Sequence, residues 1–421
     1  MLPIWGVSRP EEYYNTPMRK ILKNVYSART RNMEGFLGSF EKFLRSIISG
    51  GERSNLLAES ITELYEHLQN HDYRTLVRTE RFWNLFTSII ESYKEFEELS
   101  LFEAIEICRT IVRELEVLTV DVPKTRLVHS SIASSVGFLA VVAKLRDKTP
   151  FILTEHGIYY RERVLDIAGR FPKRQKSFWI RFERSIAKLN YEYADLIAPV
   201  SKFNARWEGY LGADKGKIEV IYNGVDTDRF KPMAVDRLTS GPVITTVTRI
   251  DRLKGVLDLI SAMATVREKV PNAKCLIFGS GSDETYLQDC LKARHSLGLS
   301  DSVEFMGFTT ETPRAFNSGD VVALPSVSEG FPYALIEGMA CEKASVATDV
   351  GGVGEALGDS GILVPPRDST RLGEALSLLL TDTLHSRKLG LAARDRILSE
   401  YTVSKFAEAY RRVYQRWMDQ Q

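Results

Sequence analysis

The strand–helix alternation is clearest in the stretch PVITTVTRIDRLKGVLDLISAMATVREKVPNAKCLIFGSGSD, residues 242–283. Its two short apolar runs, PVITTV and AKCLIF, predict buried strands, and the amphipathic segment between them predicts a helix near 255–270. A strand, a crossover helix and a second strand form a unit whose strands run parallel. The stretch therefore predicts a doubly wound parallel sheet.

The same alternation extends in both directions along the chain. Further strands are expected in RLVHSS, PFILTEHG, ADLIAPVS and KIEVIYNGV before this stretch, and in SVEFMGF, DVVALPS, ASVATDVGG and GILVPPRD after it. Helices are expected near 283–298, 333–342 and 369–381. The fold class is therefore α/β, with two Rossmann-like parallel-sheet domains.

The N-terminal part has a different residue pattern. No glycine occurs between Glu52 and Val136, and apolar residues recur there at helical spacing, which predicts helices. We expect an N-terminal domain over 1–235, helical over about 10–120 and Rossmann-like over about 126–230. A linker would lead to a second Rossmann-like domain over 240–400. A C-terminal helix within 401–421 would pack back on the N-terminal domain.

The charge balance excludes a typical nucleic-acid binder, because 56 Lys and Arg residues are offset by 55 Asp and Glu residues in a chain of 421. Four widely spaced cysteines indicate reduced thiols. The N-terminal sequence has no signal-peptide pattern, and no apolar run approaches the roughly 20 residues of a membrane span. We therefore expect a cytoplasmic protein.

Arg249 and Lys254 follow directly after the strand PVITTV, where ligands bind in parallel sheets. Two cations there would stabilise the negative charge on a nucleotide diphosphate leaving group without a metal ion. Each charge-assisted hydrogen bond contributes about 1.5–3 kcal/mol. A solvated basic loop explains the same residues, so this cluster alone leaves both interpretations open.

The segment SEGFPYALIEGMA, residues 328–340, contains Glu329 and Glu337 with seven residues between them. The backbone at Gly330, Phe331, Pro332 and Tyr333 would lie at a helix N-terminus, which favours phosphate. Glu337 would lie inside that helix and could accept hydrogen bonds from ribose hydroxyls. A carboxylate buried there without a partner would be costly, which disfavours a purely structural role.

Two more clusters stand at strand ends. His156 follows PFILTE and precedes a glycine, so its imidazole could bind a sugar hydroxyl, although a core histidine fits equally well. His129 also ends a strand and is a weaker cleft candidate. Gly279 and Gly281 would let a ligand approach the backbone closely, although most such turns only join a strand to a helix. No residue spacing suggests a metal site.

Taken together, the clusters resemble the retaining family 4 glycosyltransferases of GT-B fold. TRIDRLKG, FGSGSD, EFMGF and EGFPYALIE occur in that family's order and spacing, and the resemblance covers about residues 126–400. TEHGIYYRER and YNGVD are similar to the cytoplasmic glycosyltransferase of the Pel exopolysaccharide system, which uses a UDP-sugar.

The resemblance implies that the domain over 1–235 is the acceptor-side domain, that the domain over 240–400 binds the nucleotide sugar, and that the two face a cleft. It also implies metal-independent, retaining transfer of a hexose from a nucleotide sugar to a glycan acceptor. The donor would be UDP-glucose or a UDP-N-acetylhexosamine, with no further cofactor. A membrane-bound polysaccharide synthase or export complex would be a partner. In such an enzyme Arg249 and Lys254 would bind the diphosphate, and Glu329 would bind hydroxyl groups of the donor sugar. Glu337 would bind the ribose, and Met306 and Phe308 would border the base. The backbone of residues 330–333 would contact the sugar and the phosphate, and His156 would lie near the reacting carbon.

The N-terminal sequence MLPIWGVSRPEEYYNTP departs from the family, which opens with a strand and a glycine-rich loop. We expect the first strand and this loop to be missing, supplied by another chain, or lost together with acceptor binding. The rival interpretation is therefore a nucleotide-sugar-binding subunit of an exopolysaccharide assembly, with little activity alone. An epimerase or phosphorylase is disfavoured, because nothing suggests a water-activating base or a pyridoxal lysine.

Overall fold

The computed structural model describes residues 33–96, 99–236, 239–281 and 283–419. The chain divides into two compact units, each with its own set of packed elements. The first unit comprises residues 1–153 and 159–195, and the second comprises residues 154–158 and 196–421. The boundary falls inside one strand, so that residues 154–158 belong with the C-terminal part of the chain.

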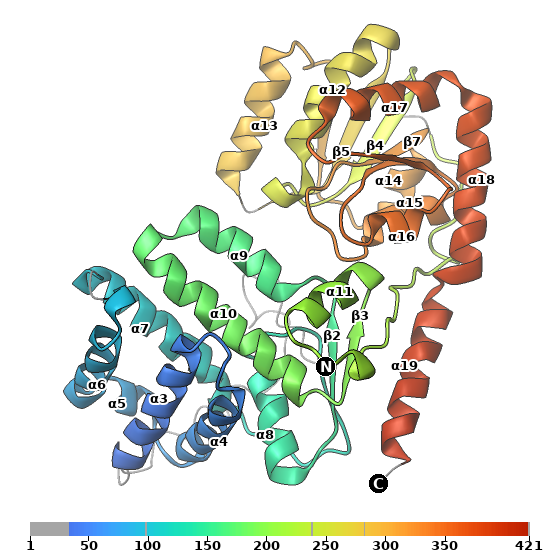
Figure 1. Ribbon diagram of the computed structural model, residues 1–421. Helices are drawn as coiled ribbons and strands as arrows, with labels where there is room; N and C mark the ends of the chain where they lie inside the picture. Colours follow the sequence, from blue (N-terminus) through green and yellow to red (C-terminus); the bar gives the residue numbers. More distant parts are fainter. Residues whose placement is uncertain (1–32, 97–98, 237–238, 282, 420–421) are drawn as a thin grey trace. The chain divides into compact units, whose positions relative to one another are not determined.

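The first unit begins with a helical region (blue in Figure 1). Its elements are α3 (Met33–Ile48), α4 (Ser54–Asn70), α5 (Tyr73–Val77), α6 (Glu80–Glu91), η2 (Lys94–Phe96), α7 (Leu101–Leu115) and η3 (Glu116–Thr119). The apolar faces interlock through aromatic rings, with the Phe40 and Phe82 centroids 4.5 Å apart. The predicted helical region is confirmed from residue 33 onward; its part over 10–32, and the expected loss of a first strand and loop, lie outside the described residues.

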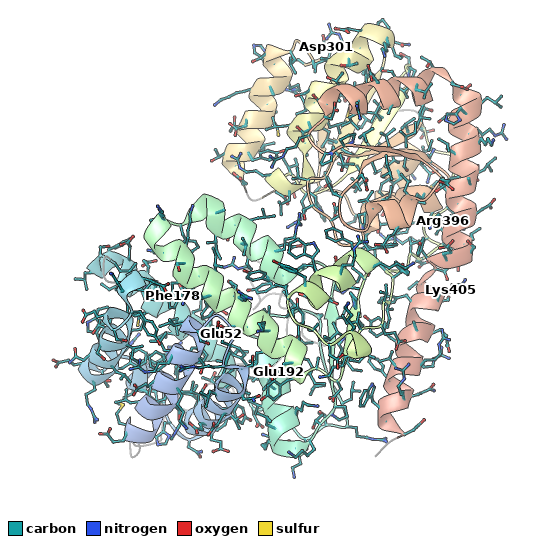
Figure 2. The ribbon with its side chains drawn as sticks, viewed as in Figure 1. Glu52, Phe178, Glu192, Asp301, Arg396 and Lys405 are labelled. Carbon is teal, nitrogen blue, oxygen red and sulfur yellow. The ribbon has the colours of Figure 1, made fainter. Side chains whose placement is uncertain are left out.

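Two strands and three helices complete the first unit: β1 (Val128–Ser130), α8 (Gly137–Asp147), β2 (Phe151–Glu155), α9 (Tyr159–Arg170) and α10 (Lys173–Tyr193). β1 pairs with β2 in parallel, with His129 opposite Ile152. Figure 2 labels Phe178 on α10, whose fully buried ring meets that of Phe96 edge-on at 5.8 Å. The long amphipathic α10 is thereby packed on the helical region.

The second unit is built on a six-stranded parallel sheet of order β6-β5-β4-β7-β8-β9. The strands are β4 (Val243–Val247), β5 (Lys274–Phe278), β6 (Val303–Gly307), β7 (Val321–Leu324), β8 (Ala344–Thr348) and β9 (Ile362–Val364). Connections run through η5 (Arg252–Lys254), α12 (Val256–Lys269), α13 (Glu284–Ser296), α14 (Thr312–Asn317), α15 (Tyr333–Ala340), α16 (Val353–Leu357) and α17 (Ser369–Thr381). Every strand and helix expected between 242 and 381 is confirmed.

The C-terminal helices α18 (Thr383–Glu400) and α19 (Val403–Met418) also belong to the second unit (red in Figure 1). Arg396, labelled in Figure 2, fixes α18 through hydrogen bonds from its guanidinium to the carbonyl oxygens of Glu355 and Ala356. On α19, the Tyr410 hydroxyl lies 2.6 Å from Thr154 Oγ1. α19 therefore holds the short segment 154–158 in the second unit.

One predicted strand, KIEVIYNGV, is wrong. After β3 (Leu196–Pro199), α11 (Lys202–Tyr210) and η4 (Lys215–Lys217), this segment forms an isolated bridge between Ile197 and Ile218. The N–H groups of Glu219 and Ile221 still donate to Ile197 O and Pro199 O, each at 2.9 Å. The segment is extended and partly paired, and then leaves β3 because its Asn223 side chain bonds elsewhere.

No helix in the described part of the chain is both long enough and apolar enough to cross a membrane.

Candidate functional site

A pocket of about 300 Å³ lies in the second unit at the carboxyl ends of β4 and β7. Its walls are formed by His156, Asn223, Val247, Thr248, Arg249, Lys254, Leu324, Glu329, Gly330, Phe331, Pro332, Tyr333 and Ala334. The structure thus brings together eight of the residues predicted for the site: His156, Arg249, Lys254, Glu329, Gly330, Phe331, Pro332 and Tyr333. The five others, Gly279, Gly281, Met306, Phe308 and Glu337, do not line this pocket.

The centre of the pocket wall is an ion pair between Lys254 and Glu329. Lys254 Nζ lies 2.7 Å from Glu329 Oε1, and Ser326 Oγ donates to the same oxygen at 2.6 Å. The side chains are only 19% and 9% exposed, so water screens this pair weakly. Ser326 is not apparent from the sequence as a site residue, because its role depends on how its loop folds back.

The loop after β4 is held against the loop after β7 by its backbone. The Val327 N–H donates to Leu253 O at 2.8 Å. Gly255 has φ +64°, and a Cβ there would lie 2.0 Å from Pro325 O. Only glycine tolerates both this left-handed conformation and this close approach. Lys254, between Leu253 and Gly255, is therefore placed precisely opposite Glu329.

Arg249 is exposed by comparison. Its side chain is 73% exposed, and its guanidinium lies 3.2 Å from the carboxylate of Asp251. Exposed pairs of this kind contribute about 0–1 kcal/mol. The Asp251 carboxylate also accepts hydrogen bonds from the N–H groups of Leu253 and Lys254. Arg249 can therefore turn toward an anionic ligand at little cost.

Gly279 and Gly281 support this loop from the neighbouring strand β5. A Cβ on Gly279 would lie 1.8 Å from Thr248 O, and one on Gly281 would lie 2.0 Å from Ile250 O. Alternating hydrogen bonds join the two segments, from Thr248 N–H to Phe278 O and from Ile250 N–H to Ser280 O. Close packing of two backbones accounts for both glycines, and their contact with a ligand stays a prediction.

His156 enters the pocket from the end of β2. Burial lowers its pKa, and the neighbouring Asn223 side chain partly offsets this effect, so the imidazole is neutral at pH 7. The buried Asn223 donates from Nδ2 to Phe331 O at 2.9 Å. Asn223 thus lies beside His156 and is bonded to the glycine turn after β7. We did not predict this residue; the only signal was an Asn-Gly pair ending an apolar run.

Glu337 lies on α15, outside the pocket lining. Burial raises the pKa of its carboxyl to about 7, and the charge of Arg229 opposes this shift. Within the described part of the chain, no hydrogen bond or ion pair to this carboxylate is present. A partly buried acid without a protein partner is suited to accept hydroxyl groups of a ligand.

Met306 and Phe308 lie at the end of the edge strand β6, and their side chains are 38% and 75% exposed. An exposed aromatic ring at a strand end can stack on a planar ligand group such as a nucleobase. Among residues 33–96, 99–236, 239–281 and 283–419, no three His, Cys, Asp or Glu side chains are grouped to hold a metal ion.

The first unit has a pocket of its own, of about 610 Å³, around the end of β1. Its lining includes Glu114, Asp121, His129, Arg163 and the four serines at 130, 131, 134 and 135. Ser135 Oγ donates to Glu114, and Arg163 Nε donates to the buried Glu183 at 2.8 Å. Carboxylates, hydroxyls and an imidazole are the groups that bind neutral polyhydroxyl compounds.

Comparison with known proteins places these features in a family. Residues 241–382 match the family described as glycosyl transferases group 1, and residues 10–216 match a domain of unknown function, DUF3492. The chain is 30% identical over 312 residues to a D-inositol 3-phosphate glycosyltransferase of Salinispora arenicola, covering 68% of each protein. The chain belongs to the group 1 glycosyltransferases.

Other members of this glycosyltransferase family match a shorter part. A glycogen synthase of Mycobacterium tuberculosis is 30% identical over 226 residues, so that the match spans about half of each protein, 53% of this chain and 54% of the synthase. A mannosyltransferase of the same organism, described as GDP-mannose-dependent, is 26% identical over 67% of the chain and 76% of that enzyme.

Solved structures agree on the fold. Anabaena Alr3699/HepE in complex with UDP and glucose superposes with a TM-score of 0.61 at 20% identity, covering 75% of this glycosyltransferase and 83% of HepE. Sucrose-phosphate synthase from Thermosynechococcus elongatus superposes with a TM-score of 0.60 at 20% identity, covering 81% and 80%. The fold is therefore GT-B, as the sequence predicts.

Proposed function

We propose that this group 1 glycosyltransferase transfers a hexose from a nucleotide diphosphate sugar to a glycan acceptor, with retention of configuration and without a metal ion. One observation carries the proposal: Arg249, the Lys254–Glu329 pair and a neutral His156 line one pocket at the carboxyl ends of parallel strands. This is the position where α/β sheets bind nucleotides.

The donor diphosphate would occupy the side of the pocket formed by Arg249 and Lys254. Both cations could follow the charge that develops on the leaving phosphate as the glycosidic bond breaks. Glu329 already accepts hydrogen bonds from Lys254 and Ser326, so its carboxylate is fixed and can receive hydroxyl groups of the donor sugar. The backbone of residues 330–333 would contact the sugar and the phosphate.

The nucleoside would extend from the pocket toward Glu337 and the end of β6. Glu337 would bind the ribose hydroxyls, because its carboxyl lacks a partner among the described residues and is partly buried. Phe308, with Met306 beside it, would border the base. We propose UDP as the nucleotide, since HepE was crystallised with UDP, although the GDP-mannose-dependent relative makes GDP the alternative.

For the chemical step, His156 would contact the sugar near the reacting carbon as a neutral hydrogen-bonding group. Glu329 is bound to Lys254 and is therefore a weak nucleophile. We propose that the acceptor attacks from the face that the leaving group departs, so that no covalent glycosyl–enzyme forms. The leaving phosphate would take up the acceptor proton.

We place the acceptor in polysaccharide biosynthesis, in the cytoplasm, with a membrane-bound synthase or export complex as partner, as the similarity to the Pel glycosyltransferase implies. The pocket at the end of β1 offers carboxylate, hydroxyl and imidazole groups for a glycan. The second candidate function is a nucleotide-sugar-binding subunit with little activity alone.

The test is release of nucleotide from UDP-glucose, UDP-N-acetylglucosamine and GDP-mannose with a panel of oligosaccharide acceptors in EDTA. The proposal predicts acceptor-dependent release from one donor and a product with the donor's anomeric configuration by NMR. Donor binding without transfer to any acceptor would favour the subunit function, and an inverted product would contradict the retaining mechanism.

A further inference from the structure

Two fully buried carboxyl groups lie directly behind His156. Glu155 is the last residue of β2 and immediately precedes His156 in the chain. Glu208 lies on α11. Both side chains are 0% exposed. Burial removes water from both carboxyl groups, so their protonation depends on the groups that surround them.

The backbone hydrogen bonds show how the two groups come together. Asn204 Nδ2 on α11 and the N–H of Val200 both donate to Glu155 O, each at 3.3 Å. Asn204 and Glu208 are four residues apart and therefore share one face of α11. Glu208 therefore lies on the face of α11 that contacts the end of β2, one helical turn after Asn204.

No N–H or hydroxyl donor of the described residues reaches either carboxyl oxygen of Glu208. Two adjacent carboxyl groups in an apolar interior cannot both ionise. Burial and then the neighbouring charge of Glu155 raise the pKa of Glu208 to about 10. Glu155 is the one titratable group, among those the structure describes, that acts on Glu208. Glu208 is therefore the member of the pair that keeps a proton at neutral pH.

We propose that Glu155 and Glu208 share one proton, which Glu208 donates to the Glu155 carboxylate, and that this pair positions His156 in the donor pocket. The positioning part rests on the function proposed above. Thr154, on one side of Glu155, is hydrogen-bonded to Tyr410, and His156, on the other side, has its carbonyl oxygen against Gly330.

The contact with Gly330 leaves no room for adjustment, because a Cβ there would lie 1.8 Å from His156 O. If both glutamates were charged, their repulsion would displace the end of β2. That displacement would move His156 and push on the turn that carries Glu329. Glu155 and Glu208 are therefore positioning residues: they touch neither donor nor acceptor but fix the residues that do.

Infrared spectroscopy in deuterated buffer tests the proton directly, because a protonated carboxyl has a C=O band distinct from that of a carboxylate. The measurement is made near pH 8, above the pKa of about 7 of Glu337, so that Glu337 contributes little. We expect the difference spectrum of the native chain against Glu208→Gln to contain one protonated-carboxyl band. Glu268→Gln, on the exposed surface of α12, is the matched control and should leave that band intact. A band unchanged by Glu208→Gln would overturn the proposal.

Stability gives a second readout that needs no ligand. Between the unfolded-state pKa of a glutamate, about 4.3, and the folded value of about 10, the folded chain holds a proton that the unfolded chain has lost. As the pH rises, the native chain should therefore lose more stability than Glu208→Gln, because the variant lacks this proton. We expect the difference between the Tm of the variant and the Tm of the native chain to increase in the variant's favour from about pH 6 to about pH 9. A Tm difference independent of pH would contradict a protonated Glu208.

The positioning role is tested by calorimetric titration with UDP near pH 8. Glu208→Gln keeps a donor at this place and should change Kd by no more than about twofold, whereas Glu208→Ala should weaken binding by about tenfold. Equal losses in both variants would overturn the positioning role. Absence of UDP binding by the native chain would instead contradict the proposed function. The infrared and Tm results would still show whether Glu155 and Glu208 share a proton.

Discussion

Lys254 Nζ and Glu329 Oε1 are 2.7 Å apart and join the loop after β4 to the loop after β7. The backbones of the two loops are also joined, through Gly255 against Pro325 O and through the Val327–Leu253 hydrogen bond. The pair is therefore held ready before any ligand arrives. Preorganised charge of this kind contributes more to catalysis than charge that must move into place.

Lys254→Ala should reduce kcat by about 100-fold, while the affinity for the donor falls much less, because Lys254 would act mainly on the charge that develops in the transition state. The comparison is kcat and the calorimetric Kd for the same nucleotide sugar. Lys388→Ala, on an exposed position of α18, is the control and should leave both unchanged. Equal losses in kcat and affinity would show that Lys254 serves ground-state binding instead.

Glu337→Ala should weaken UDP binding by about tenfold or more, since a hydrogen bond to a charged acceptor contributes about 1.5–3 kcal/mol. The turnover at saturating donor should change little, because ribose lies away from the reacting carbon. Titration of the variant with UDP and with uracil alone separates ribose recognition from base stacking. An unchanged Kd for UDP would remove Glu337 from the site.

The same residue predicts a pH dependence of stability. The folded pKa of Glu337 is about 7, above the unfolded value of about 4.3, so the folded chain binds the extra proton between these values. The free energy of unfolding should therefore fall as the pH rises through this window and then level off above about pH 7.

Glu337→Gln removes this effect. Its free energy of unfolding should exceed that of the native chain by at most about 4 kcal/mol at pH 8, and by less at pH 5. Urea unfolding at the two pH values measures the difference. A gain as large at pH 5 as at pH 8 would contradict a raised pKa.

Gly281→Ala should destabilise the protein by about 1–3 kcal/mol without any ligand, because the new Cβ would lie 2.0 Å from Ile250 O and displace the Arg249 loop. Gly38→Ala on α3 is the matched control: nothing lies within 4 Å of its Cβ, and alanine favours a helix. Thermal unfolding of both variants is the measurement. Unchanged stability in Gly281→Ala, with loss of UDP binding, would assign this glycine to the ligand instead.

Excess EDTA should leave transfer activity unchanged, because Arg249 and Lys254 would supply the positive charge for the diphosphate. Assays after dialysis against EDTA, with and without added Mg²⁺ or Mn²⁺, test this. Activity lost in EDTA and restored only by a divalent ion would contradict the metal-independent mechanism.

The sequence was sufficient to predict the six strands of the parallel sheet in the second unit, because each is a short apolar run bounded by polar turns. A helical pattern follows four of them; the short helices α14 and α16 were not predicted. KIEVIYNGV has the same composition, yet only one bridge joins it to β3. The spacing of apolar residues predicts burial, but it does not distinguish a paired strand from a buried extended segment. Here the segment leaves β3, and its Asn223 side chain donates to Phe331 O.

The site was predictable where its residues stand at strand ends, since the carboxyl ends of parallel strands meet at one edge. His156, Arg249, Lys254 and Glu329 come together for this reason. Gly279 and Gly281 were ambiguous, because a ligand and a neighbouring backbone both require the absence of a Cβ. Pairs such as Glu155 and Glu208 depend on which helix face meets which strand end, which residue spacing does not encode.

The central claim is that the second unit binds a nucleotide, with the diphosphate at Arg249 and Lys254 in the pocket and the ribose at Glu337 outside it. The most direct test is calorimetric titration of the purified chain, in EDTA, with UDP, ADP and GDP, alongside the Glu337→Ala variant. The account predicts one binding site, tightest for UDP, with affinity reduced in the variant. Absence of binding for all three nucleotides, or equal binding by the variant, would contradict it.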